Sequence, residues 1–178
     1  MAIPILFVHI KLQDLKISTD YLTNMNNRNQ LIRYLTAKIR TESENLYLFM
    51  MDVDKFKSIN DNYGHTEGDN ALISVADKLK EVAREFGGII ARYGGDEFAM
   101  ALVGDVNIAD DYEAIRERIH QHSMKDPFVQ ELDYNINASM GIAECVITDD
   151  VDLDSLIKLA DMRMYEDKEA RKGSNEIR

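Results

Sequence analysis

The sequence predicts an α+β domain in which helices flank a central, mainly antiparallel sheet. Two observations lead to this fold class. Hydrophobic residues switch repeatedly between the 3.6-residue period of helices and the extended runs of strands. The resulting order is helix, strand, helix, hairpin, helix, strand, helix, which contains the β-α-β-β-α-β arrangement of a ferredoxin-like fold. The 178 residues are enough for one such domain and contain no internal repeat or linker.

Each element follows from its local pattern. Apolar residues at helical spacing predict helices at about 27–40, 55–61, 69–86 and 110–122, and a last helix from about Asp152. Asp69 is a candidate N-cap for the third of these. Strands are expected at 46–51, 89–91, 98–103 and 135–146. The first strand is apolar throughout, which suits cover on both faces. The glycines Gly94 and Gly95 predict a tight hairpin turn with φ > 0.

Composition narrows the classes of function. The formal charge of −11 argues against nonspecific binding to nucleic acid or to an anionic membrane. Cys145 is the single cysteine, so an internal disulfide is excluded and a cytoplasmic location is expected. The apolar start is far shorter than the ~20 residues that a membrane span needs. We therefore expect a connector at residues 1–17 and one domain at 18–178.

Two pairs of carboxylates flank the expected strands. Asp52 and Asp54 follow the first strand, and Asp96 and Glu97 open the strand that leaves the hairpin. In the expected fold these strands are neighbours, so the acids converge at one edge, as oxygen ligands do around hard cations such as Mg²⁺. Two other interpretations stay open: a solvated acidic turn at the hairpin, and Asp54 as a helix N-cap.

Four motifs carry a family resemblance that covers roughly residues 18–175. Gly94-Gly95-Asp96-Glu97-Phe98 resembles the signature of the GGDEF family of diguanylate cyclases, and the stretch 52–72 is similar to the second hallmark of that family. Residues 20–28 and 160–168 match two further motifs. The resemblance implies a palm-type domain like those of nucleotidyl cyclases, which joins two GTP molecules into cyclic di-GMP and releases two pyrophosphates.

The resemblance also implies roles at the carboxylates. Asp52, the carbonyl of Val53, Asp96 and Glu97 would hold Mg²⁺ or Mn²⁺, two ions per GTP. Asp96 or Glu97 would orient or deprotonate the attacking 3′-hydroxyl, and Lys57 would assist catalysis at the phosphates. The split between Asp96 and Glu97 stays open, with Asp96 the first choice for the metal. Two domains must face each other, so a transient homodimer is implied.

Substrate contacts are implied on both sides of this centre. Asp69 would accept hydrogen bonds from N1–H and N2–H₂ of guanine, donors that adenine lacks, which makes it the residue for GTP selectivity. Its alternative role is the N-cap noted above. The other implied substrate contacts are Phe56, Asn60, His65, Gly94, Gly95, Lys168 and Lys172. For both lysines the alternative is a solvated position near the end of a helix, which the helix dipole favours.

Departures from the family pattern sharpen the prediction. Glu85 and Gly88 replace the Arg and Asp of the usual product-inhibition site, so no such site is expected. Asn24 stands at a family glycine, and asparagine tolerates the left-handed conformation. Glycine is displaced to Gly173, which makes Lys172 a weaker candidate than Lys168.

Two other functions stay open: a catalytically idle GTP-binding regulatory module and a metal-dependent nuclease or phosphatase. A sensor or effector domain elsewhere is an expected partner.

Overall fold

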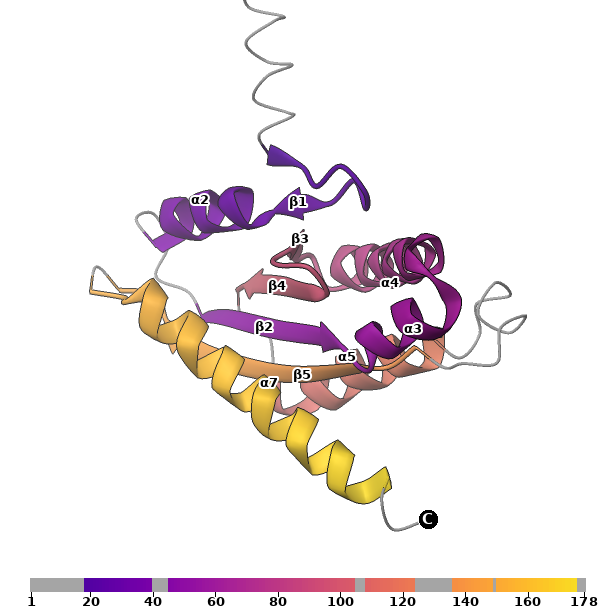
Figure 1. The fold of residues 1–178 in the computed structure, drawn as a ribbon. Helices are drawn as coiled ribbons and strands as arrows, with labels where there is room; N and C mark the ends of the chain where they lie inside the picture. Colours follow the sequence, from indigo (N-terminus) through magenta and orange to yellow (C-terminus); the bar gives the residue numbers. More distant parts are fainter. Residues whose placement is uncertain (1–17, 40–44, 105–107, 124–135, 149, 176–178) are drawn as a thin grey trace, which may run out of the picture.

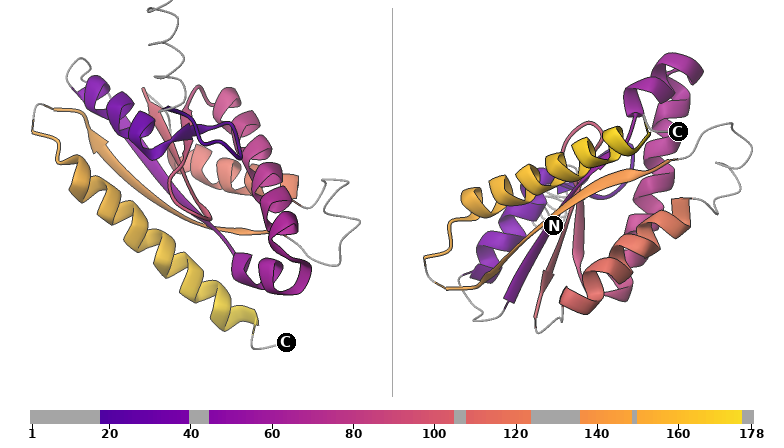
Figure 2. Two further views of the ribbon diagram at one scale, coloured as in Figure 1. Left: turned by 45° about the horizontal axis from the view of Figure 1, so that its top comes forward. Right: turned by 90° about the horizontal axis from the view of Figure 1, so that it is seen from below.

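The central sheet has five strands in the order β1-β3-β4-β2-β5, and helices cover both of its faces (Figures 1 and 2). This computed structural model describes residues 18–39, 45–104, 108–123, 136–148 and 150–175. The strands are β1 (Asn26–Asn27), β2 (Asn45–Val53), β3 (Ile89–Arg92), β4 (Glu97–Val103) and β5 (Ala138–Val146). The helices are α2 (Arg28–Ile39), α3 (Phe56–Tyr63), α4 (His65–Glu85), α5 (Ile108–Ser123) and α7 (Leu153–Asn175).

The predicted fold class is confirmed. The strands β2, β3, β4 and β5 pair antiparallel in the order of a β-α-β-β-α-β sheet, and only the two-residue β1 pairs parallel, with β3. No sequence pattern indicated β1, because its two asparagines are not hydrophobic. The connector expected at residues 1–17 lies outside the described residues.

Alternate side chains of β2 enter two separate cores, as predicted for a strand covered on both faces. Phe49 and Met51 pack in the core that contains α4 and α5 residues. Leu48 and Met50 pack in the core that contains α2 and α7 residues. Because side chains alternate along a strand, Asp52 projects to the same face as Met50, toward α7. The strand pattern therefore places this carboxylate at the edge of the α7 core.

Two predicted helix caps are wrong. Helix α4 begins at His65, four residues before Asp69, and its N-cap Gly64 makes no side-chain cap. Gly64 has φ 87°, so one residue is enough to turn the chain from α3 into α4. Asp54 does not cap α3 either, because Lys55 takes the N-cap position with φ 56°. Both carboxylates are therefore available for other contacts.

Other boundaries shift less. Strand β5 begins at Ala138 rather than at residue 135, which lies outside the described residues, and the buried Ile136 precedes the strand. Asn24 adopts the left-handed conformation with φ 53°, as predicted. Within the described ranges, no helix is both long enough and apolar enough to cross a membrane.

Candidate active site

The carboxylates at the ends of β2 and β4 meet, as the sequence predicted. Asp52 lies opposite Glu97 in the antiparallel ladder. One residue further on, the Val53 N–H donates to the carbonyl oxygen of Asp96 at 3.1 Å. Asp52 is buried, and Asp96 and Glu97 are half-buried. The acids therefore lie at one edge of the sheet rather than in a solvated turn.

The turn between β3 and β4 closes on the backbone of Glu97. The N–H groups of Tyr93 and Gly94 donate to its carbonyl oxygen at 2.8 and 3.2 Å. The prediction of φ > 0 at Gly94 and Gly95 is wrong, because neither is among the glycines with positive φ. Gly94 lies against the Glu97 side chain instead: a Cβ there would clash with the carboxylate oxygen Oε2, so that carboxylate would have to shift. At Gly95 a Cβ would meet no atom within 4 Å, so this position opens onto free space.

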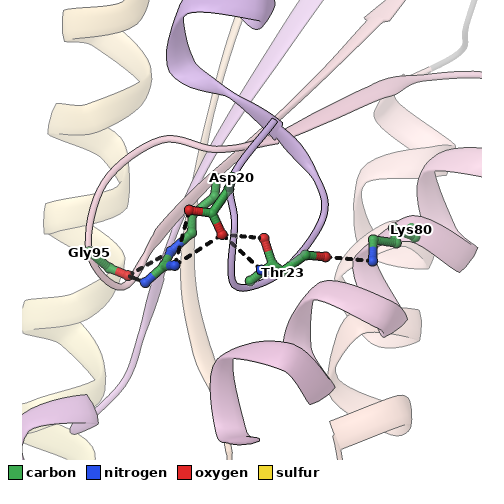
Figure 3. Close-up of polar contacts among 5 residues, drawn as sticks. Asp20, Thr23, Lys80 and Gly95 are labelled. Atoms are coloured by element: carbon green, nitrogen blue, oxygen red, sulfur yellow. Dashed lines mark hydrogen bonds and ion pairs between the residues drawn. The ribbon is translucent and has the colours of Figure 1, made fainter. Parts of the chain in front are cut away.

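Arg92 fixes the outer side of this turn (Figure 3). Its guanidinium donates to the Gly95 carbonyl from Nη2 at 2.6 Å and from Nε at 3.0 Å. The same group pairs with Asp20, at 3.0 Å from Nη1 to Oδ1. Asp20 in turn accepts from the N–H and the hydroxyl of Thr23, and Lys80 of α4 donates to the Thr23 carbonyl at 2.8 Å. A chain of contacts thus joins the turn to the 18–28 segment and to α4.

A lysine from α7 neutralises the innermost carboxylate. The Lys168 Nζ lies 2.5 Å from Oδ1 of Asp52. Burial raises the pKa of Asp52, and the charges of Asp96 and Asp54 raise it further, whereas Lys168 lowers it; the net direction is upward. This contact contradicts the alternative that Lys168 is a solvated surface residue. Lys172 also belongs to α7, but its side chain lies outside the described part of the chain.

The pKa of Glu97 is shifted by burial and by the charges of neighbouring residues. Burial raises the pKa of Glu97, and the charges of Asp161, Asp52 and Asp96 add to the rise against the opposing effect of Lys168. A carboxyl group with a raised pKa holds a proton more readily than an exposed one. Glu97 is therefore suited to exchange a proton with a bound hydroxyl.

Asp54 is held by residues that the sequence did not indicate. Its Oδ1 accepts a hydrogen bond from the hydroxyl of the buried Ser139 at 2.5 Å, and its Oδ2 lies 3.7 Å from Nη1 of Arg171. Ser139 follows Ala138 in β5 and lies opposite Asp52 in the ladder. Pairing across strands more than 80 residues apart leaves no local signal, so only the predicted sheet order could have suggested Ser139.

The donor set fits a hard divalent cation. Carboxylate oxygens are the preferred ligands of Mg²⁺, and these acids lie close enough together that the charge of Asp96 helps to raise the pKa of both Asp52 and Glu97. Among the described residues, however, no three acidic, histidine or cysteine side chains already stand at metal-binding spacing. A cation at these carboxylates would therefore draw further ligands from elsewhere, and at Oδ1 of Asp52 it would replace Lys168.

The residues expected to bind the base and phosphates lie at the corner between α3 and α4. Phe56 begins α3 and packs partly on the core, whereas Lys57 is exposed. The Asn60 amide lies against Gly68, where a Cβ would clash with its Oδ1. His65 and Asp69 are exposed in the first turns of α4. Because α3 follows β2 directly, this corner lies beyond the strand end that carries Asp52.

The chain belongs to the GGDEF domain family. The family model described as "Diguanylate cyclase, GGDEF domain" matches residues 17–174. The chain is 36% identical over 154 residues to diguanylate cyclase DgcP of Escherichia coli, covering 84% of this chain and 44% of that protein. It is also 36% identical over 152 residues to diguanylate cyclase VdcA of Vibrio cholerae, covering 84% and 43%. The chain therefore spans less than half the length of these relatives.

Solved structures agree with this assignment. The coiled coil and GGDEF domain of DgcB from Caulobacter crescentus, solved with cyclic di-GMP, aligns with a TM-score of 0.81 at 28% identity, over 95% of this chain and 90% of that one. Diguanylate cyclase SiaD of Pseudomonas aeruginosa, solved with its activator SiaC, aligns with a TM-score of 0.75 at 25% identity, over 93% and 63%.

Proposed function

We propose that this domain is a diguanylate cyclase, which condenses two GTP molecules into cyclic di-GMP and releases two pyrophosphates. The observation that carries the proposal is the pairing of Asp52 with Glu97 across β2 and β4, beside the turn of Asp96 and within reach of Lys168. In a member of the GGDEF family, this arrangement would provide carboxylates for a metal and a cation for phosphate. Each 3′-hydroxyl attacks the α-phosphate of the other GTP, so two copies of the domain must face each other as a transient homodimer.

The carboxylates have two tasks in this reaction. Asp52, the Val53 carbonyl, Asp96 and Glu97 would hold Mg²⁺ or Mn²⁺, two ions per GTP. When bound, such ions neutralise the charge that spreads over the transferring phosphoryl oxygens. Glu97, whose pKa is raised, is suited to take the proton from the attacking hydroxyl. Asp96 is the other candidate for this proton transfer, and we assign it to the metal instead.

The helices on either side supply the substrate contacts. Lys57, Lys168 and Lys172 would face the phosphates. Guanine would lie at the α3–α4 corner with Asp69 accepting from N1–H and N2–H₂; its other contacts there would be Phe56, Asn60 and His65. The open space above Gly95 leaves room for the nucleotide to approach the backbone.

Control of the activity would come from outside residues 18–178. A sensor or effector domain is the proposed partner, because this chain covers less than half of DgcP and VdcA. We place the domain in the cytoplasm, where GTP is available and where a single unpaired cysteine is stable.

The test is to incubate the purified protein with GTP and Mg²⁺ and to separate the products by chromatography. Cyclic di-GMP is expected. Unchanged bound GTP would indicate an idle module instead, and GDP or GMP would indicate hydrolysis. Asp96→Ala should lower the rate by on the order of 100-fold or more, since a centre that stabilises developing charge loses a central group. Asp154→Ala, which removes an exposed carboxylate at the other end of α7, is the matched control.

We further propose that the product does not inhibit this domain. Glu85, which replaces the family arginine, pairs with Arg118 at 3.1 Å. Gly88, which replaces the family aspartate, has no room for a side chain, because a Cβ there would clash with Leu102 and lie 2.9 Å from the Ala101 carbonyl. Saturating cyclic di-GMP should leave the initial rate unchanged. Potent noncompetitive inhibition would contradict this proposal.

A further inference from the structure

The carboxyl-terminal half of α7 is attached to the rest of the domain through charged side chains. In the first half, Leu156, Ala160 and Met164 form a buried apolar stripe at helical spacing. The next position of the stripe is Lys168, and residues 165, 166, 169 and 170 are exposed. Apolar packing therefore ends at Met164, one turn before the lysine that reaches Asp52.

Asp167 is the centre of this polar attachment. Its Oδ2 accepts a hydrogen bond from the Met140 N–H at 3.0 Å, and its Oδ1 accepts one from Nη2 of Arg116 at 2.9 Å. Arg171, one turn further along α7, pairs with Oδ2 at 2.9 Å. Met140 belongs to β5, which is the edge strand of the sheet. The carboxylate thus joins α7 to the edge of the sheet and to α5.

The contact between Arg116 of α5 and Asp167 of α7 stabilises the position of α7 more than that of α5. Helix α5 is already anchored by the buried Ile115 and Ile119 and by Tyr112, whose ring stacks on Phe49 at 6.4 Å. Among the described side chains of its own helix, Arg116 pairs with the largely exposed Glu113, at 3.9 Å. Its shorter contact is the one to Asp167, whose side chain is 17% exposed.

We propose that Arg116 and Asp167 are positioning residues that hold Lys168 at the carboxylate edge and thereby set its reach toward the substrate phosphates. The inference rests on the proposed function. Lysine carries a flexible four-carbon stem, so its ammonium is placed reproducibly only if its backbone is fixed. Asp167 precedes Lys168 directly and fixes that backbone. The same attachment would keep the ammonium beside the site if a cation replaced it at Asp52.

The first experiment measures binding, not turnover. The probe is 3′-deoxy-GTP with Mg²⁺, which lacks the attacking hydroxyl, and calorimetry gives its affinity. Arg116→Ala should weaken binding about fivefold, the effect of losing one partly buried ion pair. Arg118→Ala removes an arginine two residues away on the same helix, in a more exposed pair with Glu85, and should leave the affinity unchanged.

A double-mutant cycle distinguishes positioning from a general structural role. If Arg116 acts through Lys168, Arg116→Ala should weaken binding in the parent protein but not in the Lys168→Met background. Its effect on the melting temperature should be the same in both backgrounds. Arg116→Lys, which keeps the charge, should recover part of the affinity. An equal loss of affinity with and without Lys168 would overturn the inference.

The outcomes separate this inference from the proposed function. Coupling between Arg116 and Lys168 in a protein that makes no cyclic di-GMP would support the inference and overturn the activity. Cyclic di-GMP formation without coupling would overturn the inference alone. A parent protein that binds no 3′-deoxy-GTP would overturn both.

Discussion

The β3–β4 hairpin and the carboxyl-terminal half of α7 approach the same carboxylates but are held by different interactions. The hairpin is part of the sheet: β4 pairs with both β3 and β2, and backbone hydrogen bonds from Tyr93 and Gly94 close its turn. Among the described hydrogen bonds, the end of α7 is joined to the backbone of the sheet by one, in which the Met140 N–H donates to the Asp167 side chain. One side is fixed by the backbone, and the other by side-chain charge.

This difference matches the tasks of the two sides. Backbone ladders hold Asp52 and Glu97 in one register, which a metal site requires. Ion pairs between partly exposed groups contribute only about 0.2–1 kcal/mol each, so they rearrange at little cost. In the proposed reaction an adjustable Lys168 would yield Oδ1 of Asp52 to the metal, while the carboxylates stay in register.

The largest expected effect comes from removing the arginine that holds the turn of the β3–β4 hairpin. Arg92→Ala removes the donors to the Gly95 carbonyl and leaves Asp20, whose side chain is 15% exposed, without its arginine. Displacing the turn by about 1 Å should lower kcat/KM on the order of 100-fold, and the unpaired group should cost about 1–3 kcal/mol of unfolding free energy. Cyclase kinetics and thermal unfolding measure both.

Two further variants complete this test. Arg33→Ala removes an exposed arginine whose guanidinium donates to the hydroxyl of Ser18, which lies outside the turn, and it should change neither quantity. Arg92→Lys keeps a charge for Asp20 but lacks the fork that also reaches Gly95, so an intermediate rate is expected. Full activity in Arg92→Ala, despite lowered stability, would show that the turn needs no such anchor.

A smaller effect is expected when the pH is lowered until Asp20, the partner of Arg92, takes up a proton. Burial would raise the pKa of Asp20, but the hydrogen bonds from Thr23 and the hydrogen bond and charge of Arg92 outweigh it, and the pKa lies below its ordinary value of 3.8. The unfolded state therefore binds the proton first, so the stabilisation is complete above the unfolded pKa and is lost as the pH falls through the folded one. The melting temperatures of the parent and of Asp20→Asn should differ at pH 6, and the difference should shrink as the pH falls below 3.8. A constant difference across this range would contradict the assignment.

The fixed side was also the side that the sequence could predict. Hydrophobic periodicity and the glycine turn predicted β2, the hairpin and the meeting of Asp52 with Glu97, because strand neighbours follow from element order. Even there the backbone conformation expected at Gly94 was wrong, and its neighbour is the Glu97 carboxylate, which would have to shift to admit a Cβ. Local propensity indicates where a turn occurs but not which side chain folds back on it.

The adjustable side was predicted only in part. The family resemblance implied Lys168 as a substrate contact, and its contact with Asp52 contradicts the alternative of a solvated position. Ser139, Arg116 and the pairing of Asp167 escaped prediction. Each depends on contacts between elements far apart in the chain, and charged residues on a helix are usually solvated. Their partners become visible only when α5, β5 and α7 are packed together.

The smallest expected effect tests the comparison directly through hydrogen exchange. Raising sodium chloride from about 0.1 M to about 1 M shortens the Debye length from about 10 Å to about 3 Å, which weakens partly exposed ion pairs and leaves backbone ladders intact. The amides of residues 165–171 should then exchange about threefold to fivefold faster, as expected for the loss of roughly 1 kcal/mol. Those of 156–164, on the apolar half of the same helix, and of 97–103 should not change. An equal response in both halves of α7 would mean that apolar packing continues past Met164, and the distinction between a fixed and an adjustable side would fail.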